Sequence, residues 1–149
     1  MPDLPDPADL LPHRPPFLFV DEVLALVPGE SARARLHVDP EAAFLAGHFP
    51  GNPILPGVII VEALAQTGAL AALAEPEAAG KLALFAGIER ARFRRVVRPG
   101  DDVILETRLT RRRGLLGAGE ATATVGGELA CETALTFALV DAEGAGARA

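Results

Sequence analysis

Hydrophobic and polar residues alternate strictly over residues 31–38, where every second position is Ala, Leu or Val. A period of two predicts a β-strand with one buried face. Residues 17–27 form a mostly hydrophobic run that also predicts a strand, ended by the turn signal Pro28-Gly29. Asp39-Pro40 ends the second strand, and we expect a short helical turn over residues 41–45.

A much longer run, residues 57–74, is hydrophobic nearly all round. Such a pattern predicts a helix that is buried on most sides, as if a sheet wrapped it. Pro56 stands at its start, where a missing N–H is tolerated, and Glu75-Pro76 ends it. The preceding segment, Gly47–Gly57, is rich in glycine and proline and predicts a rigid, non-repetitive loop.

The remainder of the chain is predicted to be mostly β. Its strand candidates are Lys81–Ile88, Asp102–Arg112, Leu116–Val125 and Glu128–Val140. Two strands, one buried helix and four further strands make an α+β protein. The chain shows no internal repeat and no long linker, so we expect one domain over residues 1–149, with a core of roughly 10–140. Met1–Asp9 and Asp141–Ala149 are expected to be flexible.

Composition narrows the function. A hydrophobic content of 50% suffices for a core, and a formal net charge of −6 disfavours nonspecific binding to nucleic acid. The single cysteine, Cys131, excludes an internal disulfide and a thiolate zinc cluster, and the three scattered histidines do not suggest a metal site. Glu62 within the hydrophobic run makes a membrane span unfavourable. Because the N-terminus lacks a signal-peptide pattern, we expect a cytoplasmic protein.

Two polar residues, Glu62 and Gln66, interrupt the predicted buried helix and share one face because they are four positions apart. A buried carboxylate is unfavourable unless it is paired, hydrogen-bonded or protonated. A group held in this way suits a general acid. The sequence leaves open the alternative that Glu62 pairs with an arginine or reaches solvent at the helix end.

His48 lies in the rigid loop before this helix, and histidine is the side chain best suited to exchange a proton near neutral pH. Gly57 begins the helix, where free N–H groups and the helix dipole favour an oxyanion or a polarised carbonyl. A structural hydrogen bond is an equally good role for His48, and Gly57 also fits a purely conformational one. We expect His13 and His37 to be structural or surface residues.

Basic residues gather in two segments of this acidic chain. Their alternation in the first segment predicts one charged strand face, which is usually a solvated surface. The functional alternative is docking of an acidic carrier protein, with an attraction that salt weakens. The residues that this alternative would use are Arg90, Arg92, Arg94, Arg95, Arg98, Arg111, Arg112 and Arg113.

Four segments carry recognisable motifs: LPHRPPFLFVD at 11–21, GHFPGNPILPGVIIVEALAQ at 47–66, FAGIERARFRR at 85–95 and PGD at 99–101. Together they resemble the FabZ-type (3R)-hydroxyacyl-acyl carrier protein dehydratases. The resemblance spans nearly the whole chain, and its longest motif contains both His48 and Glu62.

This resemblance implies a hot-dog fold, in which an antiparallel sheet wraps one long helix. It implies a homodimer whose sheets join edge to edge, with three dimers commonly forming a hexamer. The active site would lie at the dimer interface, with His48 from one subunit and Glu62 from the other. The substrate would arrive on the phosphopantetheine arm of acyl carrier protein, and no metal or redox cofactor is required.

The resemblance also implies a role for each site residue. His48 would remove the proton beside the thioester carbonyl, and Glu62 would protonate the departing 3-hydroxyl. The N–H of Gly57 would polarise the carbonyl, and Gln66 would orient Glu62. A glutamate at position 62, where FabA-type enzymes carry aspartate, implies dehydration without isomerisation.

Three positions depart from the family pattern: Pro15 and Leu84 stand where large or aromatic residues are usual, and Val96 where proline is usual. The chain has no tyrosine, so a tyrosine that gates the acyl tunnel in the family is absent or replaced by phenylalanine. The first expectation is a dehydratase of type II fatty-acid synthesis. The alternatives are a dehydratase of a polyketide or polyene pathway and a noncatalytic acyl-binding subunit, which the intact His48 and Glu62 disfavour.

Overall fold

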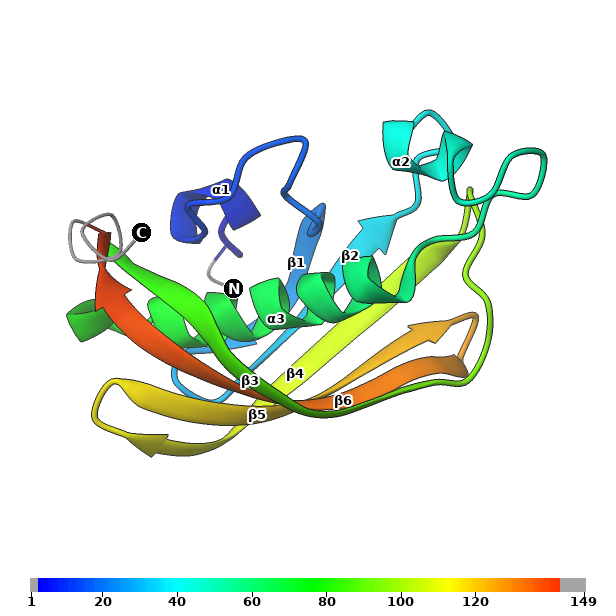
Figure 1. Ribbon diagram of the computed structural model, residues 1–149. Helices are drawn as coiled ribbons and strands as arrows, with labels where there is room; N and C mark the ends of the chain where they lie inside the picture. The colour runs from blue at the N-terminus through cyan, green and yellow to red at the C-terminus, as the bar shows by residue number, and fades with distance from the viewer. Residues whose placement is uncertain (1–2, 143–149) are drawn as a thin grey trace.

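One curved antiparallel sheet surrounds one long helix in the computed structural model, which describes residues 3–142 (Figure 1). The long helix, α3, spans Gly57–Leu73. The short helices α1 (Pro7–Leu10) and α2 (Ala43–Ala46) lie on one side of α3, opposite the strands that wrap its other side. A 3-10 helix, η1 (Pro76–Ala78), follows α3. The predicted α+β hot-dog architecture is confirmed.

The sheet has six strands: β1 (Glu22–Val27), β2 (Ser31–His37), β3 (Lys81–Phe93), β4 (Asp102–Arg113), β5 (Leu116–Val125) and β6 (Glu128–Asp141). Their order across the sheet is β1-β2-β4-β5-β6-β3, and every pairing is antiparallel. The edge strands are therefore β1 and β3. β3 pairs with β6 along its whole length, from Lys81 opposite Asp141 to Phe93 opposite Cys131.

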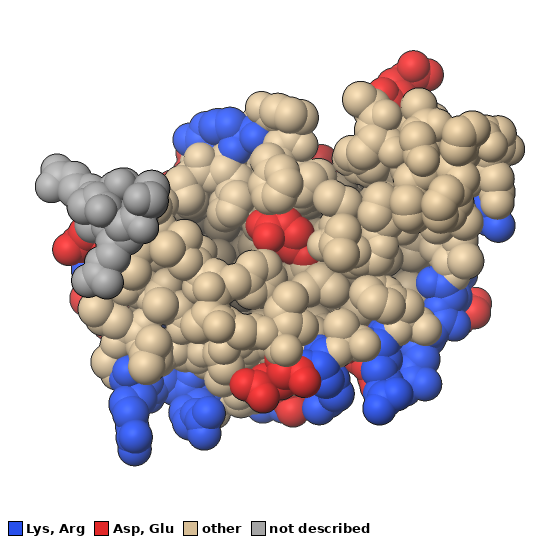
Figure 2. All heavy atoms as spheres, viewed as in Figure 1, with Lys and Arg blue, Asp and Glu red and all other residues tan. Residues whose placement is uncertain are grey.

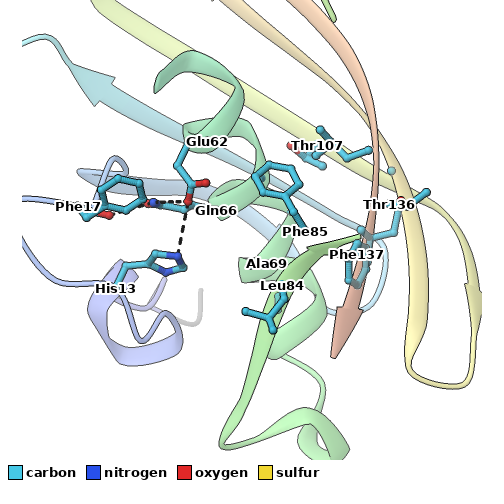
Figure 3. Close-up of a pocket in the computed structure, with 16 residues that line it drawn as sticks. His13, Phe17, Glu62, Gln66, Ala69, Leu84, Phe85, Thr107, Thr136 and Phe137 are labelled. Atoms are coloured by element: carbon cyan, nitrogen blue, oxygen red, sulfur yellow. Dashed lines mark hydrogen bonds and ion pairs between the residues drawn. The ribbon is translucent and has the colours of Figure 1, made fainter. Parts of the chain in front are cut away.

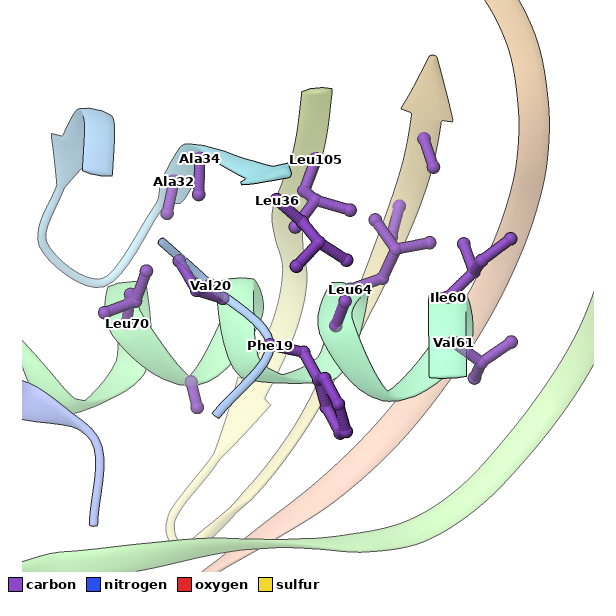
Figure 4. Packing of buried hydrophobic residues seen from close by; sticks show 14 of the residues in the cluster. Phe19, Val20, Ala32, Ala34, Leu36, Ile60, Val61, Leu64, Leu70 and Leu105 are labelled. Atoms are coloured by element: carbon purple, nitrogen blue, oxygen red, sulfur yellow. The ribbon is translucent and has the colours of Figure 1, made fainter. Parts of the chain in front are cut away.

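The hydrophobic core lies between α3 and the concave face of the sheet (Figure 4). On β2 the alternating positions Ala32, Ala34 and Leu36 are buried, as the period of two predicts. Leu64 and Leu70 of α3 are fully buried against them and their neighbours. Burying a leucine side chain stabilises the fold by about 1.5–3 kcal/mol, so the hydrophobic faces of helix and sheet hold each other in place.

A glycine lets α3 lie close to the sheet. A Cβ atom on Gly68 would lie 2.9 Å from Cγ2 of Thr107 on β4. The hydroxyl of Thr107 in turn donates a hydrogen bond over 2.8 Å to the backbone oxygen of Leu64. This contact fixes the rotation of α3 about its axis, and with it the direction in which the polar residues of the helix point.

Some boundaries differ from the sequence-based expectation. β1 begins at Glu22 rather than at residue 17, because the backbone of Phe17 and Phe19 bonds to the side chain of Gln66 instead of to a strand. β3 runs to Phe93 rather than ending at Ile88. The expectation that the N-terminal segment is flexible did not anticipate α1, whose N-cap Asp6 forms a capping box. The C-terminal segment was also expected to be flexible, but most of it, residues 143–149, lies outside the described residues.

Edge strand β3 exposes several large hydrophobic side chains. Leu84, Phe85, Ile88 and Phe93 are 43–52% exposed. Figure 2 shows the face with the helix in front: it is mostly uncharged, is hollowed around a carboxylate group, and has basic side chains along one border. Among residues 3–142, no helix combines the length and hydrophobicity needed to cross a membrane.

Candidate active site

The polar face of α3 is built around Gln66, which is 1% exposed. Its Nε2 donates hydrogen bonds to Oε2 of Glu62 over 2.9 Å and to the backbone oxygen of Phe17 over 3.0 Å. Its Oε1 accepts the backbone N–H of Phe19 over 2.8 Å. These three hydrogen bonds fix the orientation of the Gln66 amide, so the donor that faces Oε2 of Glu62 cannot rotate away.

Glu62 lines a cavity of about 250 Å³ (Figure 3). Most of the wall is hydrophobic or small, with residues contributed by α3, β3, β4, β5 and β6; they include Ala69, Leu84, Phe85, Gly119, Leu135 and Phe137. The Glu62 side chain is 19% exposed. The carboxylate is therefore a polar group at the wall of a space suited to a hydrocarbon chain.

His13 lies beside Glu62, a proximity that no sequence pattern predicted. Its Nε2 is 3.6 Å from Oε2 of Glu62, and it lines the same cavity. Burial lowers the pKa of His13, the Glu62 carboxylate opposes that effect, and Arg14 adds to it. The expectation of a merely structural or surface residue missed this position. The sequence sign that could have led to it is Gln66 itself, because a buried amide needs hydrogen-bond partners from another segment, and here the segment that follows His13 supplies them.

His48 is half-buried in the loop before α3. Its Nδ1 lies 2.8 Å from the backbone oxygen of Ile54. A carbonyl oxygen only accepts hydrogen bonds, so Nδ1 carries the hydrogen and Nε2 of the neutral ring has a free lone pair. The ring also stacks on Phe49, with ring centroids 4.2 Å apart. The loop therefore presents an oriented imidazole with its basic nitrogen available.

Gly57 begins α3 beside His48, and both line a second hollow with Phe93 and Val97. A Cβ atom on Gly57 would lie 2.7 Å from the Phe93 ring, so glycine at this position lets the ring of Phe93 lie against the start of α3. No acceptor for the Gly57 N–H is found among residues 3–142. This N–H at the helix start is available to a ligand oxygen.

One chain does not bring His48 and Glu62 together. Among the described residues, His48 lines the hollow with Gly57, whereas Glu62 lines the cavity with His13. Gly57 lies with the histidine, and Gln66 lies with the glutamate. The site residues predicted from the sequence therefore form two half-sites in the single chain.

The candidate docking arginines fall into two groups. Arg94, Arg95, Arg98 and Arg112 are engaged by neighbouring side chains, namely Glu132, Glu128 with Asp101, Asn52, and Glu75 respectively. Within residues 3–142, no ion pair involves the other four, Arg90, Arg92, Arg111 and Arg113. The second group is therefore the better equipped to meet an acidic partner.

Two other residues singled out in the sequence have no place in either half-site. His37 is exposed on β2, and its Nδ1 lies 2.8 Å from Asp102, whose pKa this contact lowers. Cys131 is fully buried on β6, and burial raises the pKa of its thiol to about 11. In the part of the chain that the structure describes, no group of three or more His, Cys, Asp or Glu residues is placed to hold a metal ion.

The family model of the FabA-like domain matches residues 11–134, which is most of the chain. The chain belongs to the FabA-like family. The match includes both half-sites and every strand up to β6. Membership in the FabA-like family agrees with the FabZ-type resemblance of the motifs around His48 and Glu62.

Curated relatives show which group of the FabA-like family the chain resembles. A protein of Chloroflexus aggregans named 3-hydroxyacyl-[acyl-carrier-protein] dehydratase FabZ is 58% identical over 132 residues, covering 89% of this chain and 92% of the relative. A protein of the same name from Bacillus cereus is 52% identical over 139 residues, covering 93% and 96%. Within the FabA-like family, the resemblance to FabZ-type proteins is confirmed.

Solved structures support the fold. The dehydratase heterocomplex ApeI:P of Xenorhabdus doucetiae matches with a TM-score of 0.81, at 16% identity over 95% of each chain. The uncharacterized protein PH1136 of Pyrococcus horikoshii matches with a TM-score of 0.64, at 16% identity over 81% of this chain and 83% of that one. At such identities the likeness concerns the fold alone.

Proposed function

We propose that the protein is a hydro-lyase that dehydrates (3R)-3-hydroxyacyl-acyl carrier protein to the trans-2-enoyl form in type II fatty-acid biosynthesis. The observation that carries the proposal is the Glu62 carboxylate, held by Gln66 at the wall of a hydrophobic cavity. The 58% and 52% identity to FabZ dehydratases supports the reaction and favours fatty-acid synthesis over another pathway.

The reaction needs a base, an acid and a group that stabilises negative charge on the thioester oxygen. His48 takes the proton from C2 at its free Nε2, while the N–H of Gly57 donates to the thioester oxygen. The C2–C3 double bond forms as the C3–O bond breaks, and the proton of Glu62 goes to the departing hydroxyl, which leaves as water. His48 then loses its proton and Glu62 regains one. The C2–H electron pair becomes the new double bond and the C3–O pair leaves with the oxygen, so the substrate undergoes no net oxidation or reduction and the reaction needs no redox cofactor.

The two oxygens of Glu62 have different surroundings. Oε2 accepts the hydrogen bond from Gln66. In Figure 3 the other oxygen points toward the cavity and away from His13. An oxygen that already accepts from Gln66 is a poor place for the acid proton, so we assign that proton to Oε1, where the substrate hydroxyl would lie.

We propose that the working site forms in a homodimer. Because His48 and Glu62 line different hollows of one chain, a second subunit is the natural source of the missing half. The exposed hydrophobic side chains of edge strand β3 support joining of two sheets edge to edge, which would bury them. Within the same proposal, three such dimers assemble into a hexamer.

The partner that delivers substrate is an acyl carrier protein, and we place the enzyme in the cytoplasm as a single domain. Carrier proteins of this kind are acidic, so exposed arginines suit their docking. Of the candidate residues, Arg90, Arg92, Arg111 and Arg113, which have no ion-pair partner within residues 3–142, are the favoured contacts. The proposal assigns no metal and no other cofactor to the site.

The proposed activity is tested in the reverse direction. The purified protein is incubated with crotonyl-acyl carrier protein, and hydration is followed by loss of the enoyl absorbance. We expect turnover by the wild type and a fall of about 10²–10⁴-fold in His48→Ala and in Glu62→Gln. His37→Ala, which removes an exposed histidine from β2, serves as the matched control and should leave the rate unchanged. Absence of wild-type hydration at every chain length would refute the proposal.

A further inference from the structure

We propose that His13 is a positioning residue for the general acid: its neutral ring presents the Nε2 hydrogen to Oε2 of Glu62 and, together with Gln66, keeps that oxygen turned away from the substrate. The inference rests on the proposed function, because it gives Glu62 the role of acid. It adds a third residue to the acid half-site, contributed by the segment between α1 and β1.

The position of His13 is fixed by its own segment. Nη1 of Arg14 donates to the backbone oxygens of Leu11 and His13 over 2.8 and 2.7 Å. The N–H of Phe17 closes the following turn on the oxygen of Arg14 over 2.8 Å. The same segment then supplies the backbone groups that bind Gln66. His13 and Gln66 therefore approach Glu62 as parts of one hydrogen-bonded unit.

The tautomer of His13 follows from its surroundings. Nδ1 is buried and has no hydrogen-bond partner among the described residues, whereas Nε2 faces the Glu62 carboxylate at 3.6 Å. A hydrogen on Nδ1 would be a buried donor without an acceptor, and the Nε2 lone pair would then face carboxylate lone pairs. The hydrogen on Nε2 avoids both penalties. A separation of 3.6 Å is longer than a hydrogen bond, but such contacts commonly shorten when substrate closes a site.

Neutrality of His13 matters for the acid. A permanent cation beside Glu62 would stabilise the charged carboxylate and oppose its role as proton donor. The charged groups that act on His13 are Glu62 from α3 and Arg14 beside it. Burial is the largest influence and lowers the pKa of His13, so the ring is neutral at the pH where the enzyme is expected to work. His13 thus supplies a donor without supplying a charge.

Kinetics of three variants test the inference. His13→Leu removes the donor and should lower kcat by about 10- to 100-fold with little change in KM, because a misplaced acid affects the reacting state more than binding. His13→Gln offers an amide N–H at similar reach and should restore most of kcat. His37→Ala is the control for loss of a histidine elsewhere. Equal kcat for His13→Leu and wild type, or no rescue by His13→Gln in a folded variant, would overturn the proposal.

Nitrogen NMR of the ¹⁵N-histidine-labelled wild type gives a readout that does not depend on activity. We expect the Nε2–H tautomer for His13, and a further fall of its pKa in Glu62→Gln because the carboxylate that raises it is gone. An Nδ1–H tautomer or a charged ring at pH 7 would refute the inference even if the enzyme is active. Conversely, a wild-type protein without hydration activity would refute the proposed function. The spectra would still report whether His13 contacts Glu62.

Discussion

Gln66 donates a hydrogen bond from Nε2 to Oε2 of Glu62 one helical turn earlier, over 2.9 Å. The same amide binds the backbone of Phe17 and Phe19, so it joins α3 to the segment before β1. A single buried side chain therefore both orients the proposed acid and replaces strand pairing for two residues. We therefore expect a change at Gln66 to affect both stability and catalysis.

Replacing Gln66 with leucine should damage both properties. The change leaves a buried N–H of Phe19 and a carbonyl of Phe17 without partners, which should lower the free energy of unfolding by about 2 kcal/mol or more. For a chain of this size the melting temperature should fall by roughly 4–8 °C. The kcat for hydration should also fall, because Oε2 of Glu62 loses its donor. Circular dichroism melts and steady-state kinetics measure the two effects.

Thr67→Val is the matched control for this change. Thr67 is also buried on α3, but its hydroxyl donates within the helix to the oxygen of Ala63. Its loss should reduce stability modestly and leave kcat near the wild-type value. A Gln66→Leu variant with unchanged kcat would show that Gln66 does not position the acid.

The proposed division of the site between two subunits predicts complementation. A heterodimer with one His48→Ala subunit and one Glu62→Gln subunit, purified through two different tags, keeps one intact site if the pair is intermolecular. Its activity should be about half that of the wild type, as expected for a symmetric dimer with two sites. Pairing His48→Ala with the double variant leaves no His48 and should be inactive. An inactive test heterodimer would place both residues of a working site in one subunit.

Edge strand β3 provides a second test of the dimer. Ile88→Lys places a charge among exposed hydrophobic side chains on this strand and should convert the dimer to a monomer without activity. Val27→Lys makes the same change on the opposite edge strand, where Val27 is 44% exposed, and should leave the assembly intact. Sedimentation velocity measures the mass of each species. A dimeric, active Ile88→Lys protein would remove β3 from the interface.

The regular elements were predictable from local patterns. Residues 116–125 form β5 with the predicted bounds, and α3 ends within one residue of its predicted end. These patterns suffice because a strand with one buried face shows alternating hydrophobic residues, and a helix buried nearly all round shows a long hydrophobic run. The motif containing His48 and Glu62 was equally visible, since its residues are close in sequence.

Features that depend on long-range contacts were not predictable in this way. The start of β1 shifted because Gln66, far along the chain, binds the backbone of Phe17 and Phe19. The nearness of His13 to Glu62 likewise depends on how the N-terminal segment folds back on α3. His13 and Glu62 do not belong to a common periodic pattern in the sequence. The one sign in the sequence was Gln66, a polar residue in a predicted buried helix, which needed hydrogen-bond partners from elsewhere in the chain.

Cys131 should be unreactive in the folded protein. It is fully buried, and burial raises its thiol pKa to about 11, so at pH 8 the group is protonated as well as inaccessible. Iodoacetamide at pH 8 should therefore alkylate it only after the protein is unfolded in guanidinium chloride, as mass spectrometry would show. Rapid alkylation of the native protein would contradict the buried position of Cys131 on β6. Cys131→Ala should keep full hydration activity, because the thiol lines neither half-site.

The proposed docking of the carrier protein predicts that a change in KM depends on whether the substrate is attached to the carrier. The double variant Arg90→Glu/Arg92→Glu reverses two exposed charges on β3 that have no ion-pair partner in the described residues. Its KM for crotonyl-acyl carrier protein should rise about tenfold or more, while its KM for a small crotonyl thioester without the carrier stays unchanged. High salt should narrow the difference in KM between variant and wild type, because it screens the attraction in the wild type.

Arg33→Glu/Arg108→Glu reverses two exposed charges on β2 and β4 and serves as the control. An equal rise of KM in the control would assign the effect to overall charge, and an equal rise for the small thioester would assign it to the active site itself.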